Sequence, residues 1–113
     1  MNFKVEKNLK IITELMSFCY HFSAKDITVN IKTIDNTSNI VLDAIIKDFP
    51  KDDYDNLIQA LSIPRQHEVE QYYWHLGGES EFDCELSLVG MMVDNTNIKY
   101  ENDRLHIELQ RLE

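Results

Sequence analysis

A short segment of this chain is rich in histidine and glutamate, residue types that can bind metal ions. His67 and His75 lie there with Glu68 and Glu70, and these residue types can ligate zinc. The two histidines are eight positions apart on one predicted helix. That spacing is two turns and a further ~80°, so their imidazoles diverge too widely to share an ion. We therefore predict no metal site and interpret all four histidines as surface or half-buried side chains.

Other signatures of catalysis are missing from the sequence. It contains neither the HExxH spacing of zinc proteases nor the GxSxG motif of hydrolases, and no GxxxxGK loop that would hold phosphate. The two cysteines, Cys19 and Cys84, lie far apart in apolar surroundings and form no CxxC pair. We expect them to be buried, reduced thiols, not a redox centre.

Length and charge limit the class of protein. The chain has 113 residues, of which 43% are hydrophobic, as expected for a single domain spanning residues 1–113. The 20 acidic and 11 basic residues give a net charge of −9, which argues against nucleic acid as a partner. The amino terminus lacks an apolar signal region, and no run approaches the ~20 apolar residues of a membrane span. We therefore expect a cytoplasmic protein without membrane contact.

Apolar periodicity predicts a long first helix followed by a strand hairpin. Over residues 3–24, apolar residues recur every three or four positions and form one stripe. Over 27–34 and 40–47 they alternate with polar residues, which predicts two strands with one buried face each. The polar residues 35–39 between them are a turn by composition, so we expect an antiparallel hairpin.

The second half of the chain predicts helices and then another hairpin. Asp52 or Asp53 can cap the first of these helices, and Pro64 lies beyond its end. Gly77-Gly78 stops the next helix, and Asn102-Asp103 suits a tight hairpin turn. The predicted bounds are helices 52–61, 65–76 and 84–93, a turn at 94–97 and a hairpin over 98–110.

The resulting order is α, β, β, α, α, α, β, β, which predicts an α+β fold. We expect a two-layer α/β sandwich in which about four strands in two hairpins pack against three or four helices.

The densest aromatic segment is the best candidate for an interaction surface. It contains four consecutive residues within the predicted helix 65–76, namely Tyr72, Tyr73, Trp74 and His75. Consecutive side chains of a helix point in different directions, so they cannot all face the core. Exposed aromatic clusters are enriched at protein interfaces, which favours a protein partner or a homodimer. The alternative is that the helix packs between two layers.

The element order resembles the ATP-binding domain of sensor histidine kinases and anti-sigma-factor kinases, in the gyrase-type (GHKL) superfamily. In that family a helix carries an E-L-x-x-N-A box, a strand ends in D-x-G-x-G, and a G-L-G-L turn opens a later helix. The segment ELMSFC, residues 14–19, lies at the place of the first box. IIKDFP, residues 45–50, lies at the second and ELSL, residues 85–88, at the third, while Ile98 to Leu109 matches the closing hairpin.

The resemblance implies roles for two carboxylates and leaves other family positions unmatched. In an active enzyme Glu14 would activate water and Asp48 would bind the adenine amine, with ATP and Mg²⁺ as cofactors. Phe18, however, stands where the family's asparagine holds magnesium, and a phenyl ring cannot ligate a hard cation. The residues at or near the family's glycines, which let backbone approach the nucleotide, are Phe49, Pro50, Glu85 and Ser87.

We therefore expect a non-catalytic, cytoplasmic regulatory or interaction domain of histidine-kinase-type ATPase architecture that has lost its nucleotide motifs and needs no cofactor. It would bind a protein partner or form a homodimer, with the segment Tyr72 to Glu79 as the best interface candidate. The alternative is a divergent ATP-binding domain of a sensor histidine kinase or anti-sigma-factor-type kinase, with Glu14 and Asp48 as its remaining site residues.

Overall fold

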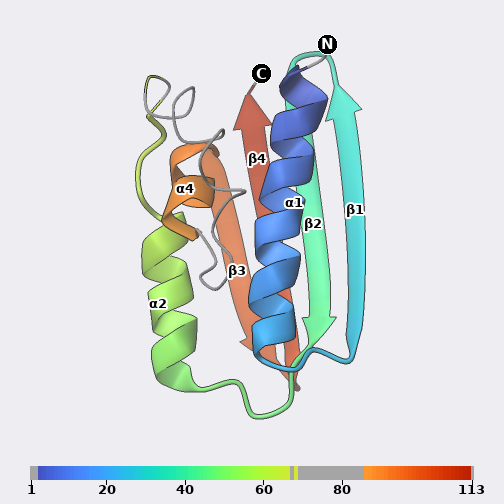
Figure 1. The fold of residues 1–113 in the computed structure, drawn as a ribbon, viewed down its shortest axis with the longest axis vertical. Coiled ribbons are helices and arrows are strands. Elements are labelled where there is room, and N and C mark those ends of the chain that lie inside the picture. Colours follow the sequence, from blue (N-terminus) through green and yellow to red (C-terminus); the bar gives the residue numbers. More distant parts are fainter. Residues whose placement is uncertain (1–2, 67, 69–85, 113) are drawn as a thin grey trace.

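A four-stranded antiparallel sheet with helices packed against it forms the part of the chain that the structure, a computed structural model, describes: residues 3–66, 68 and 86–112 (Figure 1). The sheet order is β1-β2-β4-β3. The helices are α1 (Phe3–His21), α2 (Lys51–Leu61) and α4 (Leu86–Met91), and the strands are β1 (Asp26–Ile34), β2 (Thr37–Ile45), β3 (Asn95–Glu101) and β4 (Arg104–Leu112). The predicted α+β class and the two hairpins are confirmed.

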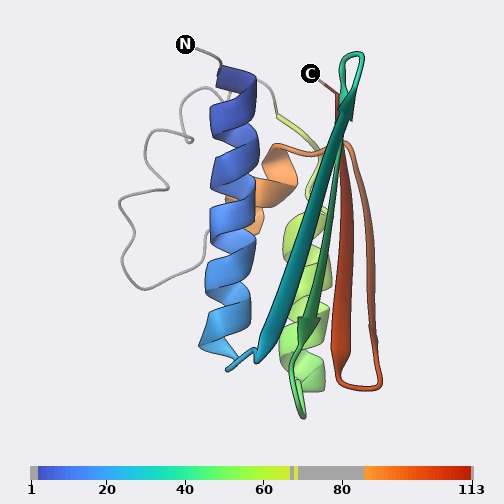
Figure 2. The ribbon, with the colours of Figure 1, turned by 90° about the vertical axis from the view of Figure 1, so that its right-hand side faces the viewer.

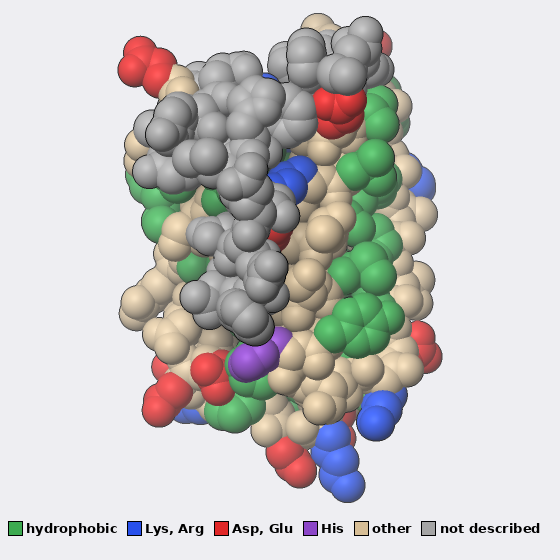
Figure 3. Space-filling view, viewed as in Figure 1, with side chains coloured by type: hydrophobic (Ala, Val, Ile, Leu, Met, Phe, Trp, Pro, Cys, Tyr) green, Lys and Arg blue, Asp and Glu red, His purple; other side chains and the backbone are tan. Residues whose placement is uncertain are grey.

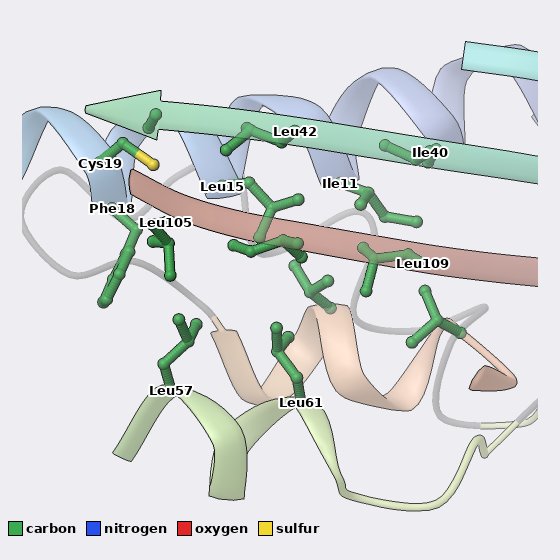
Figure 4. Packing of buried hydrophobic residues seen from close by; sticks show 14 of the residues in the cluster. Ile11, Leu15, Phe18, Cys19, Ile40, Leu42, Leu57, Leu61, Leu105 and Leu109 are labelled. Carbon is green, nitrogen blue, oxygen red and sulfur yellow. The ribbon is translucent and has the colours of Figure 1, made fainter. Parts of the chain in front are cut away.

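The central strands β2 and β4 bury one face of the sheet. Their antiparallel register aligns six apolar side chains, each at most 2% exposed. These are Ile40, Leu42 and Ala44 of β2, paired with Leu109, Ile107 and Leu105 of β4. Ile11 and Leu15 of α1 point toward them, as do Leu57 and Leu61 of α2 (Figure 4). Figure 2 shows α1 lying along this side of the sheet. Cys19 is fully buried in the same core, as predicted, whereas Cys84 lies outside the described residues.

The end of α1 differs from the prediction, because the helix stops at His21 and not at residue 24. Ser23 has a φ of 61°, in the left-handed region. Its N–H donates to the carbonyl of Tyr20 at 3.0 Å, and the N–H of Ala24 donates to that of Cys19 at 3.0 Å. These two bonds form a Schellman motif, which satisfies the last carbonyls of the helix.

Both hairpins turn through two residues. In the first, Asp35 has a φ of 55° and β2 begins at Thr37, so the predicted turn 35–39 is too long. In the second, Asn102 and Asp103 have φ values of 52° and 62°, as a type I′ turn requires, and this prediction is confirmed. The predicted turn 94–97 is also too long, since β3 begins within it, at residue 95.

The helices of the second half also differ in detail from the prediction. Pro50 is the N-cap residue of α2, without a side-chain cap bond, so the predicted cap at Asp52 or Asp53 is wrong. The two carboxylates lie in the first turn, where they interact favourably with the helix dipole. Arg65 and Gln66 are not helical, and the rest of the predicted helix 65–76 lies almost entirely outside the described residues. None of the described helices combines the length and apolar character needed to cross a membrane.

The contact between α4 and α2 depends on Gly90. A Cβ atom at this position would overlap the backbone carbonyl oxygen of Ala60 and lie 3.3 Å from Cα of Leu61. The overlapped atom belongs to the backbone of a helix, so no rotamer change can relieve the contact. Gly90 therefore sets how closely the two helices approach.

We expect Gly90→Ala to lower the free energy of unfolding by about 1–3 kcal/mol, because α4 must move away from α2. In a helix without such a contact, replacing glycine by alanine raises the free energy of unfolding by up to ~1 kcal/mol. A decrease would therefore show that the contact with Ala60 limits the size of residue 90. Urea unfolding followed by circular dichroism measures the difference. Ser87→Ala, on the exposed side of α4, is the matched control and should change stability by less than about 0.5 kcal/mol. A Gly90→Ala protein as stable as the wild type would contradict this account.

Candidate functional site

Glu14, the carboxylate that would activate water in an active enzyme, lies on α1 and is only 6% exposed. Lys10, one turn earlier on the same helix, donates from Nζ to Oε1 of Glu14 at 3.0 Å. The lysine side chain is itself 12% exposed, so the pair is largely shielded from water. The charge of Glu14 is therefore compensated by a cation of its own helix.

Asp48, the carboxylate that would bind adenine, lies in an exposed turn after β2 with a φ of 55°. The residue after it, Phe49, turns back into the core and is 6% exposed. Tyr100 of β3 holds this turn in place. Its hydroxyl accepts the N–H of Phe49 at 3.1 Å and donates to the carbonyl of Ile46 at 2.6 Å. The turn is thus tied to the sheet, with Asp48 on its outer side.

Aromatic rings fill the region between the end of α1 and the turn that carries Asp48. The ring centroids of Phe18 and Phe49 are 5.9 Å apart, and those of Phe22 and Phe49 are 5.0 Å apart. Tyr100 lies 5.4 Å from Phe49 on its other side. The rings meet edge to face, the arrangement that aromatic pairs prefer. Phe18, which stands at the place of the family's magnesium-binding asparagine, is 7% exposed. Packed side chains therefore occupy the region where the resemblance implies a nucleotide.

The predicted interface residues lie outside the described part of the chain. These are Tyr72, Tyr73, Trp74 and His75. Glu85, in the segment compared with the third family motif, also lies outside the described residues. Ser87, the other departure in that motif, is exposed on α4.

A charged cluster that the sequence did not reveal lies on the other face of the sheet. His106 of β4 pairs with Asp43 of β2 in the strand register. Its Nδ1 is 2.7 Å from Oδ1 of Asp43, and its Nε2 is 2.9 Å from Oε1 of Glu108. Hydrogen bonds to Glu108 and Asp43 raise the pKa of His106 above its usual 6.5, and the bond from His106 lowers the pKa of Glu108. We name these three residues the His106 cluster.

The His106 cluster links β2 to β4 across the open face of the sheet. Both ring nitrogens already face carboxylates, so neither is available to accept a proton from a substrate or to ligate a metal. In the described part of the chain, no group of three or more His, Cys, Asp or Glu side chains could hold a metal ion. A hollow of about 530 Å³ beside the cluster is lined by both Lys99 and Arg104 and both Asp43 and Glu101, so its charge favours neither anions nor cations.

Comparisons with known proteins add no relative. The chain matches no model of a protein family, and no curated protein matches it.

The pKa shifts of the His106 cluster predict how stability depends on pH. The pKa of His106 is raised by folding, so its contribution is complete below about pH 6.5 and is lost as the pH rises through the raised value. The pKa of Glu108 is lowered, so its contribution is complete above about pH 4.5 and is lost as the pH falls through the lowered value. The cluster should therefore stabilise the fold most between these two values.

His106→Gln tests this dependence. In urea unfolding we expect it to lower the free energy of unfolding by at most about 1 kcal/mol near pH 5.5, because the cluster is partly exposed. The difference from the wild type should shrink as the pH rises above 7. Gln59→Ala changes an exposed side chain of α2 that does not titrate, and it is the control for which the difference from the wild type should not vary with pH. A His106→Gln effect that is the same at pH 5.5 and pH 9 would contradict the proposed ionic origin.

Proposed function

We propose that this chain is a non-catalytic interaction domain, with a two-layer α/β architecture like that of the histidine-kinase-type ATPase domain and without a nucleotide site. The observation that carries the proposal is the aromatic packing of Phe18, Phe22 and Phe49 between α1 and the Asp48 turn. A bound nucleotide in that region would have to displace these rings, at a cost of several kcal/mol for exposing or cavity-forming core aromatics.

The surroundings of the two retained carboxylates support the same proposal. A magnesium–phosphate site needs open oxygen ligands and positive groups facing the phosphates. Glu14 is shielded and paired with Lys10, while Asp48 lies in an exposed turn on the far side of Phe49. The two carboxylates thus differ in environment, and Phe18, one turn after Glu14, packs against Phe49, the residue after Asp48.

The proposed domain acts through its surface, in the cytoplasm, by binding a protein. The aromatic segment at Tyr72–His75 is a candidate contact by its composition. Net charge of −9 keeps such a domain soluble and disfavours nucleic acid as its partner.

A thermal shift experiment with Mg-ATP tests the proposal. We expect the melting temperature to stay within about 1 °C at ligand concentrations that saturate ordinary ATP sites, because nothing in the folded state binds the nucleotide. A ligand present at 100 times its dissociation constant would add about 2.7 kcal/mol, or several degrees for a domain of this size.

Variants separate specific from nonspecific effects in this experiment. A rise of several degrees that Asp48→Asn abolishes would contradict the proposal and support the divergent ATP-binding domain. Asp52→Asn, an exposed carboxylate of α2, is the matched control. A small shift that responds equally to both variants would indicate general binding of magnesium or nucleotide to acidic residues and would leave the proposal standing.

A further inference from the structure

The two edge strands of the sheet, β3 and β1, differ in whether other residues bond to their outer backbone groups. At the β3 edge, the hydroxyl of Tyr54 in α2 donates to the carbonyl of Ile98 at 3.3 Å. At the β1 edge, no hydrogen bond from any described residue reaches the outer side of the strand. A strand edge left in this state presents a row of backbone donors and acceptors to another chain.

The backbone groups that face outward on β1 follow from its turn. A two-residue turn makes Ile34 and Thr37 a hydrogen-bonded pair, and such pairs alternate with non-bonded pairs along the strand. Asp26 is then bonded to Ile45, and the N–H of Lys25 donates to the same Ile45 carbonyl at 3.1 Å, as in a β-bulge. The N–H and C=O groups that point away from β2 therefore belong to Ile27, Val29, Ile31 and Thr33.

Apolar side chains lie beside this edge. Val5 and Leu9 on α1 are 50% and 53% exposed, and Ile31 of β1 is 41% exposed. In Figure 3 a hydrophobic stripe runs along the molecule where α1 and β1 lie in Figure 1. The covered face of β1 carries no charged residue between Ile27 and Ile31, although a charge at such a place is a common defence against pairing.

We propose that β1 pairs antiparallel with β1 of a second copy of this chain, about a twofold axis at Val29. This inference rests on the proposed function, in which the domain acts by binding a protein. It adds that the protein bound is a second copy of the same chain. In this register Val29 faces Val29 of the second copy, and Ile27 faces Ile31 of the second copy on the covered face of the joined sheet. On the open face, Asp26 faces Lys32 of the second copy. Each position from Asp26 to Lys32 thus meets a residue of matching chemistry, while Thr33 and Ile34 lie beyond the paired residues.

Neighbouring registers lack this match. Moving the axis to Asn30 places Asp26 opposite Ile34 of the second copy and Lys32 opposite Thr28, so the charges lose their partners. Moving it by half a step would pair residues that point to opposite faces, which a symmetric sheet does not allow. The self-complementarity about Val29 is the reason to propose a second copy as the occupant and not an unrelated peptide.

The twofold axis at Val29 is perpendicular to the sheet, so both copies of α1 lie on the same side. The exposed apolar side chains of α1, Val5 and Leu9, then lie near the join between the two sheets. Strand pairing alone is only marginally stable in water. Burial of Val5 and Leu9 at the interface would add the hydrophobic stabilisation that the backbone hydrogen bonds do not provide. The joined sheet would have eight strands and would end at the two β3 edges, where Tyr54 bonds to the carbonyl of Ile98.

Sedimentation equilibrium of the intact chain tests the proposal. At about 100 µM, where an interface of ordinary size is populated, we expect the wild type to have the mass of a dimer. Ile31→Lys should raise the dimer dissociation constant by about 100-fold or more, because two lysines enter the apolar join by symmetry. Ile34→Lys is the matched control, since Ile34 is 66% exposed on the open face beyond the paired residues, and should leave the dimer intact.

A charge exchange tests the register. Asp26→Lys should weaken the dimer about tenfold by placing lysines opposite each other. The double variant Asp26→Lys/Lys32→Asp should restore the wild-type dissociation constant. Circular dichroism melts of each variant check that the monomer still folds, and Ile31→Lys should melt as the wild-type monomer does because Ile31 is already exposed there.

Several outcomes would overturn the proposal. A wild type that stays monomeric at all concentrations contradicts it. So does a dimer that resists Ile31→Lys but dissociates with Trp74→Ala, which would assign the contact to the aromatic segment. Failure of the double variant to restore pairing contradicts the register about Val29. None of these measurements contains nucleotide, so they are independent of the Mg-ATP test of the proposed function.

Discussion

The antiparallel pairing of β2 with β4 is the interaction on which the rest of the structure depends. It joins two hairpins that are far apart in the chain and aligns Ile40 with Leu109 and Leu42 with Ile107. Each of these side chains contributes about 1.5–3 kcal/mol when fully buried, and α1 and α2 can pack only on the face that carries them. Because side chains alternate, the same register brings Asp43 beside His106 on the other face. One pairing therefore creates both the core and the His106 cluster on the open face of the sheet.

The same pairing also fixes the turn that carries Asp48. β3 is attached to β4, and it carries Tyr100 to the end of β2, where the tyrosine hydroxyl bonds to the backbone of Ile46 and Phe49. With this turn tied down, Phe49 faces Phe18 of α1. A hard cation needs oxygen ligands and water, and this packing provides neither. Phe18, Phe22 and Phe49 thus belong to one packed aromatic group that joins the end of α1 to the turn after β2.

The sequence predicted what depends on local pattern and missed what depends on distant partners. Periodicity identified α1, both hairpins and the turn at Asn102-Asp103, because spacing and turn chemistry lie within a few residues of each other. The end of α1 was missed because serine, at Ser23, takes the left-handed position usually held by glycine. For the site, sequence located Glu14 and Asp48 but not their surroundings. The alternation of His106 and Glu108 with apolar residues indicated only that they lie on a solvent-exposed face. Their contact with Asp43 could not be predicted, because it depends on the register between β2 and β4.

The difference between the two sheet edges follows from how the chain is connected. The segment after β2 crosses to α2, which packs near β3 and places Tyr54 against the outer carbonyl of Ile98. β1 is the strand farthest from α2 in the sheet, and the charges it carries, Asp26 and Lys32, both lie on the open face. The covered side of β1 therefore keeps a free backbone edge next to apolar side chains of α1. This edge combines directional hydrogen bonding, apolar area and a charge pattern that matches one register of pairing with a second copy.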